Sequence, residues 1–333
     1  ESLEGLEGDA LADAKGAAQN KQWRNKNVND TYEPGSTFKI LTAAAALDSG
    51  VTTPEDSFYC SAKITVDGDT IRCWGQPHGA ETMAEGLQNS CNPVFVELAL
   101  RMGTDTFYRY LTAFGLGKTT GIDLPGESAG LLIGSRYVKI VDLARIGFGQ
   151  SVAVTPLQLM MAANACINGG KVMKPYLVAE IQSADGEVLQ RTNPTVRSTP
   201  ISTETSDTMR ELLELVVTQG GGKNAAVPGY RIGGKTGTSQ RNRDAWFMCV
   251  APKLVAGAWV GGEDQSVHPT YGGEGSIMAL PIVGEFFSTV YKNPALGISK
   301  QDRFRRPDRV TEYDCEEEMQ QSQYTEEEEG FFD

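Results

Sequence analysis

The stretch YEPGSTFKILTAAAALDSG, residues 32–50, predicts a helix that begins near Ser36 and stops at Gly50. Ser36 and Lys39 stand three positions apart, so a helix places them on one face with their Cβ atoms about 5–6 Å apart. A serine hydroxyl is a weak nucleophile until a base removes its proton, and a lysine can be that base where burial and nearby positive charge lower its pKa. The pair therefore indicates a nucleophile and its base, although most isolated S-x-x-K sequences are ordinary helix surface.

A second short motif, Ser90-Cys91-Asn92, falls within a helical pattern that an Asn-Pro pair interrupts. The Ser90 hydroxyl can pass a proton between the lysine and a leaving group, and the Asn92 amide can hold a substrate backbone. An isolated S-x-N is more often a polar loop between helices. Cys91 receives no role at this point, because the chemistry needs only its neighbours.

A third motif, Lys235-Thr236-Gly237-Thr238, stands at the end of a predicted strand. Lys235 supplies a positive charge for a terminal carboxylate, and the hydroxyls of Thr236 and Thr238 can fix that carboxylate. Gly237 lets a peptide lie close against the strand backbone. The main-chain N–H of Thr238, with that of Ser36, would form an oxyanion hole. Alone, the motif also fits a strand followed by a glycine turn.

The three motifs occur in this order with spacings of 54 and 145 residues, and in this they resemble the penicillin-binding proteins. The resemblance covers roughly residues 20–300. It implies a penicillin-binding/serine β-lactamase-like fold and a peptidoglycan D,D-transpeptidase, which forms cross-links through a Ser36 acyl-enzyme on stem peptides ending in D-Ala-D-Ala and is acylated by β-lactams. The flanking sequences that also resemble the family are Tyr32–Gly35, Asn89, Pro93, Gly233-Gly234, Gly147–Gln150 and Val154–Leu159.

The order of elements independently favours an α+β fold, an antiparallel sheet flanked by helices with an all-helical subdomain. Thr155-Pro156 predicts a helix start, with Thr155 as the N-cap and Pro156 in the first turn. Helical patterns cover 36–50, 83–102, 136–167, 203–218 and 277–291, a hairpin is predicted around Asp185-Gly186, and three strands at 230–238, 245–251 and 254–261. We expect a polar N-terminal segment at 1–30, the transpeptidase domain at 31–300, and an acidic, disordered tail at 301–333.

Two parts of the chain depart from the family pattern. Residues 8–30 lack the alternating strand pair that normally precedes S-x-x-K, so we expect either that these strands are absent or that the sheet is built differently. Residues 22–240 resemble the class B enzymes of elongation and sporulation, whereas the chain from Asp244 onward resembles class A enzymes. This change of resemblance raises the hypothesis of a chimera, with one divergent lineage as the alternative.

Charge and hydropathy exclude other classes of protein. The formal net charge of -13 argues against a nucleic-acid partner, which would need clustered Lys and Arg. No run of about 18 apolar residues and no signal peptide occur, so we expect a fragment of an anchored protein that acts at the extracytoplasmic face of the membrane. The resemblance implies a membrane glycan polymerase as partner, and the lipid-linked peptidoglycan precursor as a further ligand.

A group of metal-binding residue types lies between the first two motifs. Cys60, Cys73 and His78 can supply three ligands of a structural zinc site, with Asp56 as the fourth. Some class B relatives are similar here and bind zinc. A Cys60–Cys73 disulfide and plain packing are the alternatives. No cofactor is expected to be required for catalysis.

Rival functions share much of this pattern. A D,D-carboxypeptidase has identical motifs and uses water as acceptor. A serine β-lactamase would need a deacylation base, and no E-x-x-L-N segment supplies one. A non-catalytic β-lactam sensor or scaffold is the rival that is not an enzyme. A Ser-His-Asp triad is not credible with only two histidines, so lysine is the base by elimination as well as by resemblance.

Overall fold

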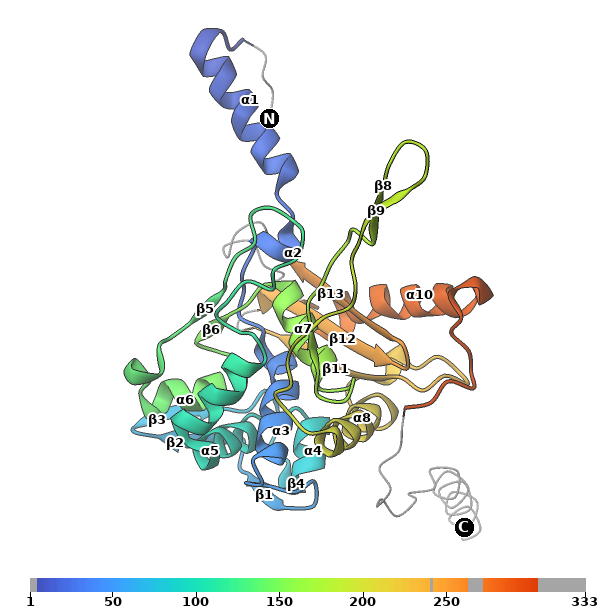
Figure 1. The fold of residues 1–333 in the computed structure, drawn as a ribbon. Coiled ribbons are helices and arrows are strands. Elements are labelled where there is room, and N and C mark those ends of the chain that lie inside the picture. Colours follow the sequence, from blue (N-terminus) through green and yellow to red (C-terminus); the bar gives the residue numbers. More distant parts are fainter. Residues whose placement is uncertain (1–4, 240–241, 263–271, 305–333) are drawn as a thin grey trace, which may run out of the picture.

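A computed structural model describes residues 5–239, 242–262 and 272–304 (Figure 1). Its body joins an antiparallel sheet to a larger group of helices, which confirms the predicted α+β class. The helix α1 (Gly8–Trp23) stands away from this body, and α2 (Lys26–Asn29) lies where the chain enters it.

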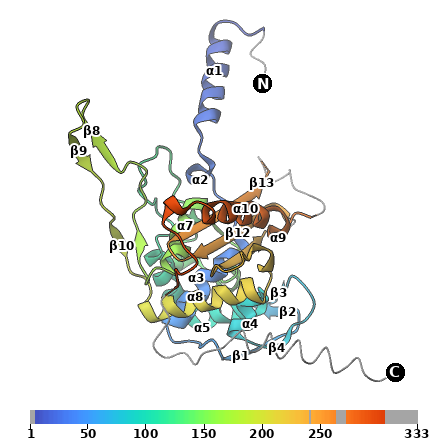
Figure 2. The ribbon, with the colours of Figure 1, turned by 90° about the vertical axis from the view of Figure 1, so that its right-hand side faces the viewer.

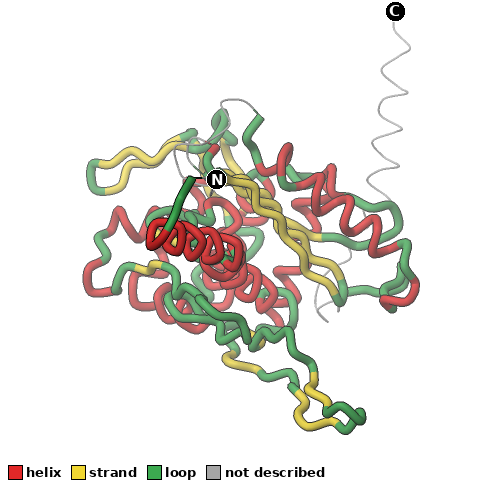
Figure 3. Tube along the Cα trace, turned by 90° about the horizontal axis from the view of Figure 1, so that it is seen from above, coloured by secondary structure: helices red, strands yellow, loops and turns green. Residues whose placement is uncertain are grey.

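The sheet consists of three antiparallel strands in the described part of the chain. They are β11 (Gly233–Thr238), β12 (Asp244–Ala251) and β13 (Leu254–Gly261), in that spatial order. Seen from above, the strands run side by side with helices on both sides (Figure 3). The tight connection from β12 to β13 confirms the predicted hairpin, and Lys253 in it has a φ of 68°.

The strand β12 is buried on both faces, because alternate side chains enter two different cores. Trp246 and Met248 belong to the main core, which contains most of the helices. Phe247 and Cys249 belong to a smaller core, which contains α10 (Leu280–Tyr291). A strand buried in this way reads as a nearly continuous apolar run, as the sequence here does.

The central helix α3 (Lys39–Asp48) continues directly from a 3₁₀ turn, η1 (Gly35–Phe38). Eight of its ten residues are buried, and their many alanines let neighbouring helices approach closely. The helices α5 and α8 pack against it. The remaining helices are α4 (Met83–Gln88), α5 (Asn92–Ala113, with a non-helical Gly103 inside), α6 (Ile140–Ile146), α7 (Pro156–Ala165), α8 (Thr203–Thr218), α9 (Gly275–Met278) and the 3₁₀ turns Ser135–Tyr137, Lys223–Ala225 and Pro294–Leu296.

Short strand pairs connect the helices. A small insert between α3 and α4 contains β1 (Ser57–Cys60) paired with β4 (Gly79–Thr82), and β2 (Lys63–Val66) paired with β3 (Asp69–Arg72). The predicted hairpin around Asp185-Gly186 is confirmed and projects from the body (Figure 2). The other short strands are β5 (Leu131–Leu132), β6 (Val152–Ala153), β7 (Val172–Met173), β8 (Glu180–Gln182), β9 (Val188–Arg191) and β10 (Val196–Ser198).

Local sequence signals explain where these elements begin. Thr155 caps α7 through a capping box with Gln158, as the Thr-Pro pair predicted.

Residues 8–30 form helices rather than a strand pair, and no residue of α1 is buried. The described residues contain no helix long and apolar enough to cross a membrane. The division into 1–30, 31–300 and 301–333 stays a prediction, and residues 305–333 of the acidic tail lie outside the described residues.

Candidate active site

A cleft of about 980 Å³ brings the three motifs together. One wall is the edge of β11 that pairs with no other strand among the described residues, another is the turn η1, and a third is the segment that joins α4 to α5. The predicted site residues that line it are Ser36, Ser90, Asn92, Thr236, Gly237 and Thr238. The two predicted lysines lie beneath this surface and are buried.

Ser36 is placed by a close crossing of two backbone segments. Gly35, with a φ of 53°, donates its main-chain N–H to the carbonyl of Gly149 at 3.0 Å. A Cβ added to Gly149 would lie 2.0 Å from the Gly35 oxygen, so only glycine fits at that crossing. This contact explains Gly149 in the Gly147–Gln150 sequence, because it connects that segment to the turn that carries the nucleophile.

Lys39 is fully buried one turn after Ser36. Its Nζ donates to the main-chain oxygen of Ser90 at 2.6 Å and to Oδ1 of Asn92 at 2.7 Å. Burial lowers the pKa of Lys39 from its usual value near 10.5 to about 8. A neutral amine keeps two hydrogens for these acceptors and leaves one lone pair for a proton, which is what a base beside Ser36 requires.

Lys235, on strand β11, contacts the hydroxyl of Ser90. Its Nζ donates to Oγ of Ser90 at 2.9 Å and to the Thr236 carbonyl at 3.2 Å. Nζ of Lys39 lies 3.3 Å from the same Oγ. Burial, and next the positive charge of Lys39, lower the pKa of Lys235 well below its usual value. The Ser90 hydroxyl therefore connects the two lysines, and with them the first and third motifs.

The backbone at Ser90 is unusual, because its φ is 56° although it is not glycine. Such a left-handed conformation costs of the order of 1–3 kcal/mol and persists only where the surroundings hold it. Here it lies between the end of α4 and the start of α5 at Asn92. The turn presents both the carbonyl and the hydroxyl of Ser90 to Lys39.

The third motif packs against the turn that carries the nucleophile. A Cβ on Gly237 would lie 2.9 Å from Cγ2 of Thr37 and 3.2 Å from the Pro34 carbonyl. Glycine is therefore needed at position 237 for this packing, in addition to the predicted close approach of a peptide. The Thr238 hydroxyl accepts from the N–H of Gly275 at 3.1 Å, which ties the end of β11 to α9.

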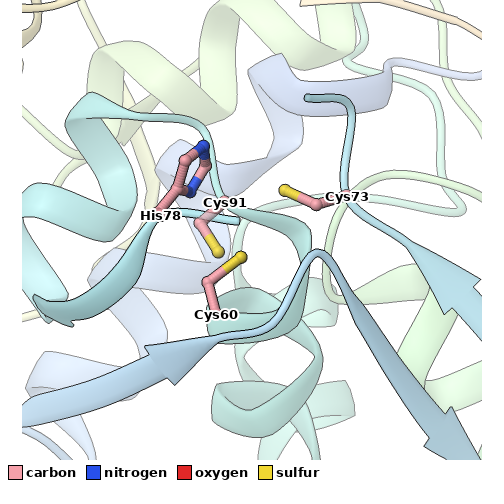
Figure 4. Close-up of side chains that lie close together, drawn as sticks. All are labelled: Cys60, Cys73, His78 and Cys91. Carbon is pink, nitrogen blue, oxygen red and sulfur yellow. The ribbon is translucent and has the colours of Figure 1, made fainter. Parts of the chain in front are cut away.

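Four metal-binding side chains point toward one another beside this cleft (Figure 4). They are Cys60, Cys73, His78 and Cys91, and their ligand atoms all lie within 4.8 Å of one another. Both cysteines of the alternative disulfide, Cys60 and Cys73, are free thiols in the structure. Three thiols and one imidazole match the donor set of a closed structural zinc site.

The structure does not place Asp56, the predicted fourth ligand, in this cluster. Its carboxylate instead accepts hydrogen bonds from the N–H and hydroxyl of Thr53 and from the hydroxyl of Thr52. These bonds hold Asp56 in the turn before β1, outside the cluster. Cys91, to which sequence analysis assigned no role, is the fourth member.

The surroundings of the cluster suit a cation. Among the described residues, Oε1 of the buried Glu81 and Nδ1 of His78 have no hydrogen-bond partner. Buried polar atoms without partners are rare, and a missing ion is one reason for them. A hydrogen bond between Cys91 and Cys73 lowers the pKa of the Cys73 thiol, so this pair readily supplies a thiolate for a metal.

Sequence reasoning missed Glu81 and Trp74 beside the second motif. Oε2 of Glu81 accepts from Nδ2 of Asn89 at 3.1 Å. Nε1 of Trp74 donates to the Asn89 carbonyl at 2.8 Å. Neither residue belongs to a recognisable motif, since their importance comes only from the fold of the insert that contains them.

Comparison with known proteins gives consistent results. The model of the penicillin binding protein transpeptidase domain matches residues 5–262, across the boundary at residue 240, and so does not support a chimera. Stage V sporulation protein D of Bacillus subtilis is 46% identical over 228 residues, which cover 68% of this chain and 35% of that protein. Peptidoglycan D,D-transpeptidase PbpA of Mycolicibacterium smegmatis is 32% identical, over 68% of this chain and 48% of that protein.

Solved structures agree with the fold. Penicillin binding protein 3 from Mycobacterium tuberculosis, complexed with aztreonam, has a TM-score of 0.73 and 28% identity, over 83% of this chain and 66% of that chain. This chain spans between a third and a half of the length of the two curated relatives.

Proposed function

Because this chain belongs to the penicillin-binding protein transpeptidase family, we propose that it is a peptidoglycan D,D-transpeptidase that works through an acyl-enzyme on Ser36. The observation that carries this proposal is the contact of both Lys39 and Lys235 with the hydroxyl of Ser90, beside the cleft that Ser36 lines. This arrangement supplies a nucleophile, a base of lowered pKa and a proton path in one place.

In the first half-reaction, Lys39 takes the proton of Ser36 while Oγ attacks the carbonyl carbon of the penultimate D-Ala. The new C–O bond replaces the C–N bond to the terminal D-Ala. The Ser90 hydroxyl passes the proton from Lys39 to the leaving amine, since it is within hydrogen-bond distance of that lysine.

Substrate binding uses the sheet edge. The donor peptide lies along β11, whose outer edge is not paired with another strand among the described residues. Lys235 and the hydroxyls of Thr236 and Thr238 attract the terminal carboxylate, and Asn92 holds the peptide backbone. The main-chain N–H groups of Ser36 and Thr238 stabilise the oxyanion.

In the second half-reaction, an amine of a neighbouring stem peptide attacks the ester. Its proton returns to Ser36 through Lys39, and the C–O bond to the serine breaks as the new amide forms. A β-lactam enters the first half-reaction in the same way, because its amide resembles the scissile bond. The aztreonam complex of a similar structure supports this part of the proposal.

The acceptor decides between a transpeptidase and a D,D-carboxypeptidase. The protein is incubated with a stem pentapeptide ending in D-Ala-D-Ala and a D-amino acid as acceptor, and products are separated by mass. We expect the acceptor-linked peptide in wild type and none in Ser36→Ala. Hydrolysed tetrapeptide alone would show a carboxypeptidase, and β-lactam adducts without any peptide turnover would show a sensor.

The setting of the whole protein is part of the proposal. Similar proteins are named for peptidoglycan transpeptidation, and that substrate lies outside the cytoplasm. We therefore place the site at the extracytoplasmic face of the membrane. A membrane glycan polymerase and its lipid-linked precursor would supply the glycan strands whose peptides this site joins.

We also propose that Cys60, Cys73, His78 and Cys91 hold a zinc ion with a structural role. With four protein ligands, a zinc ion has no open position for substrate, so it would order the insert without contacting the reacting groups. Metal analysis of protein purified without a His tag should find about one zinc per chain. Protein with no zinc after purification and after zinc addition would refute this.

A further inference from the structure

The segment Asn89–Asn92 faces two sites with alternating residues. Ser90 and Asn92 contact Lys39. Cys91, between them, belongs to the cluster of Figure 4, and Asn89 donates to Glu81. One short segment therefore forms a wall of both the catalytic cleft and the metal-binding cluster.

We propose that Glu81 and Cys91 are positioning residues, through which a metal in the cluster sets the rate at which Ser36 is acylated. This inference rests on the proposed function. It differs from the zinc proposal, because it assigns a catalytic consequence to residues that do not touch the substrate.

Glu81 lies at the centre of the connection. It is 4% exposed, and its Oε2 accepts from Nδ2 of Asn89 at 3.1 Å and lies 3.5 Å from Nδ1 of His78. Its strand β4 pairs with β1 in a register that places Phe58 opposite Glu81 and ends at Cys60. A change at His78 is therefore transmitted to Asn89 through one buried carboxylate.

The other end of the segment is tied to the same insert. Nδ2 of Asn92 donates at 2.9 Å to the carbonyl of Arg72, the residue before Cys73. The sulfur atoms of Cys73 and Cys91 lie within 4.8 Å of each other in the cluster. The insert thus contacts the segment at three points, through Asn89, Cys91 and Asn92.

These contacts explain how the strained turn persists. Ser90 has a φ of 56°, a conformation that needs support from its surroundings. Its two neighbours, Asn89 and Cys91, are both held from the insert. A cation held by the cluster would place an opposite charge near the buried carboxylate of Glu81, whose Oε2 lies 3.5 Å from Nδ1 of His78 and whose Oε1 has no hydrogen-bond partner. Without one, the support of Ser90 weakens, and with it the placement of the hydroxyl that both lysines contact.

The test measures the acylation rate constant at saturating fluorescent penicillin, with and without zinc, together with the zinc affinity and the thermal midpoint. Wild type stripped by a chelator should acylate about tenfold more slowly and recover when zinc chloride is added. Glu81→Gln keeps an oxygen that can accept from Asn89 but loses the charge, so it should bind zinc about tenfold more weakly and reach the wild-type rate once saturated. Glu81→Ala loses both functions and should stay slow even with saturating zinc.

Glu85→Gln is the matched control, because Glu85 is exposed on α4 and its carboxylate only caps that helix. It should leave zinc affinity and acylation unchanged. A wild-type rate that is equal with and without bound zinc, or absence of zinc binding, overturns the inference alone. A protein that is never acylated, loaded with zinc or not, overturns the proposed function and this inference with it.

Discussion

Nζ of Lys39 lies 2.7 Å from Oδ1 of Asn92, so a partly buried hydrogen bond joins the first and second motifs. The bond turns a carbonyl-type oxygen toward the lysine, and the same lysine donates to the Ser90 carbonyl at 2.6 Å. Both acceptors are neutral. They can hold a neutral amine as well as a charged one, and burial then decides which form prevails.

The acylation rate should rise with pH. Only the neutral form of Lys39 can accept the proton of Ser36, and its pKa of about 8 leaves most of it protonated at pH 7. Between pH 7 and pH 9 the neutral fraction grows by about tenfold. Rates with fluorescent penicillin from pH 6 to pH 10 should follow this curve, and a rate that falls over this range would contradict the assignment of Lys39.

Asn92→Asp should move that curve to higher pH. A carboxylate within hydrogen-bond distance favours the charged lysine and raises the pKa of Lys39 by about 1–3 units. Acylation at pH 7 should therefore fall at least tenfold and recover in part at pH 10. The control Asn92→Ala removes the same bond without adding charge, so an equal upward shift in both variants would contradict the electrostatic explanation.

Lys39→Met should nearly abolish acylation. Methionine keeps the unbranched stem in the buried site but cannot accept a proton, and loss of a general base costs about 10²–10⁴-fold. Thermal unfolding and circular dichroism report whether the variant is folded. A folded Lys39→Met protein that is acylated at close to the wild-type rate would require another base.

Gly149→Ala should destabilise the fold more than Gly50→Ala. Both glycines have positive φ values, 87° and 71°, so alanine costs about 1–2 kcal/mol of backbone strain at either position. Only at Gly149 does the new Cβ collide with the backbone of Gly35, which adds about 1–3 kcal/mol. Urea unfolding of both variants gives the difference, and equal losses of stability would refute the crossing as a packing constraint.

The sequence sufficed to predict the chemistry and most of the elements. Ser36, Ser90 and Lys235 belong to motifs whose residue types and order are restrictive, and the cleft brings all three together. The α7 start at Thr155 was also predictable, because a capping residue followed by proline is a local signal.

The metal cluster could be predicted only in part. Cys60, Cys73 and His78 are close in sequence, so their grouping was visible. Cys91 joins them because the left-handed turn at Ser90 directs successive side chains to different sites, and such a turn at a serine has no sequence signal. Asp56 was chosen for its residue type, but local hydroxyl groups use its carboxylate first.

The most direct test of the central claim is the intact mass of the protein after incubation with a β-lactam, followed by peptide mapping. The account predicts one adduct per chain, on the peptide that contains Ser36, and none in Ser36→Ala. An adduct on another residue, a Ser36→Ala protein that is still labelled, or an adduct that is lost within seconds would contradict it.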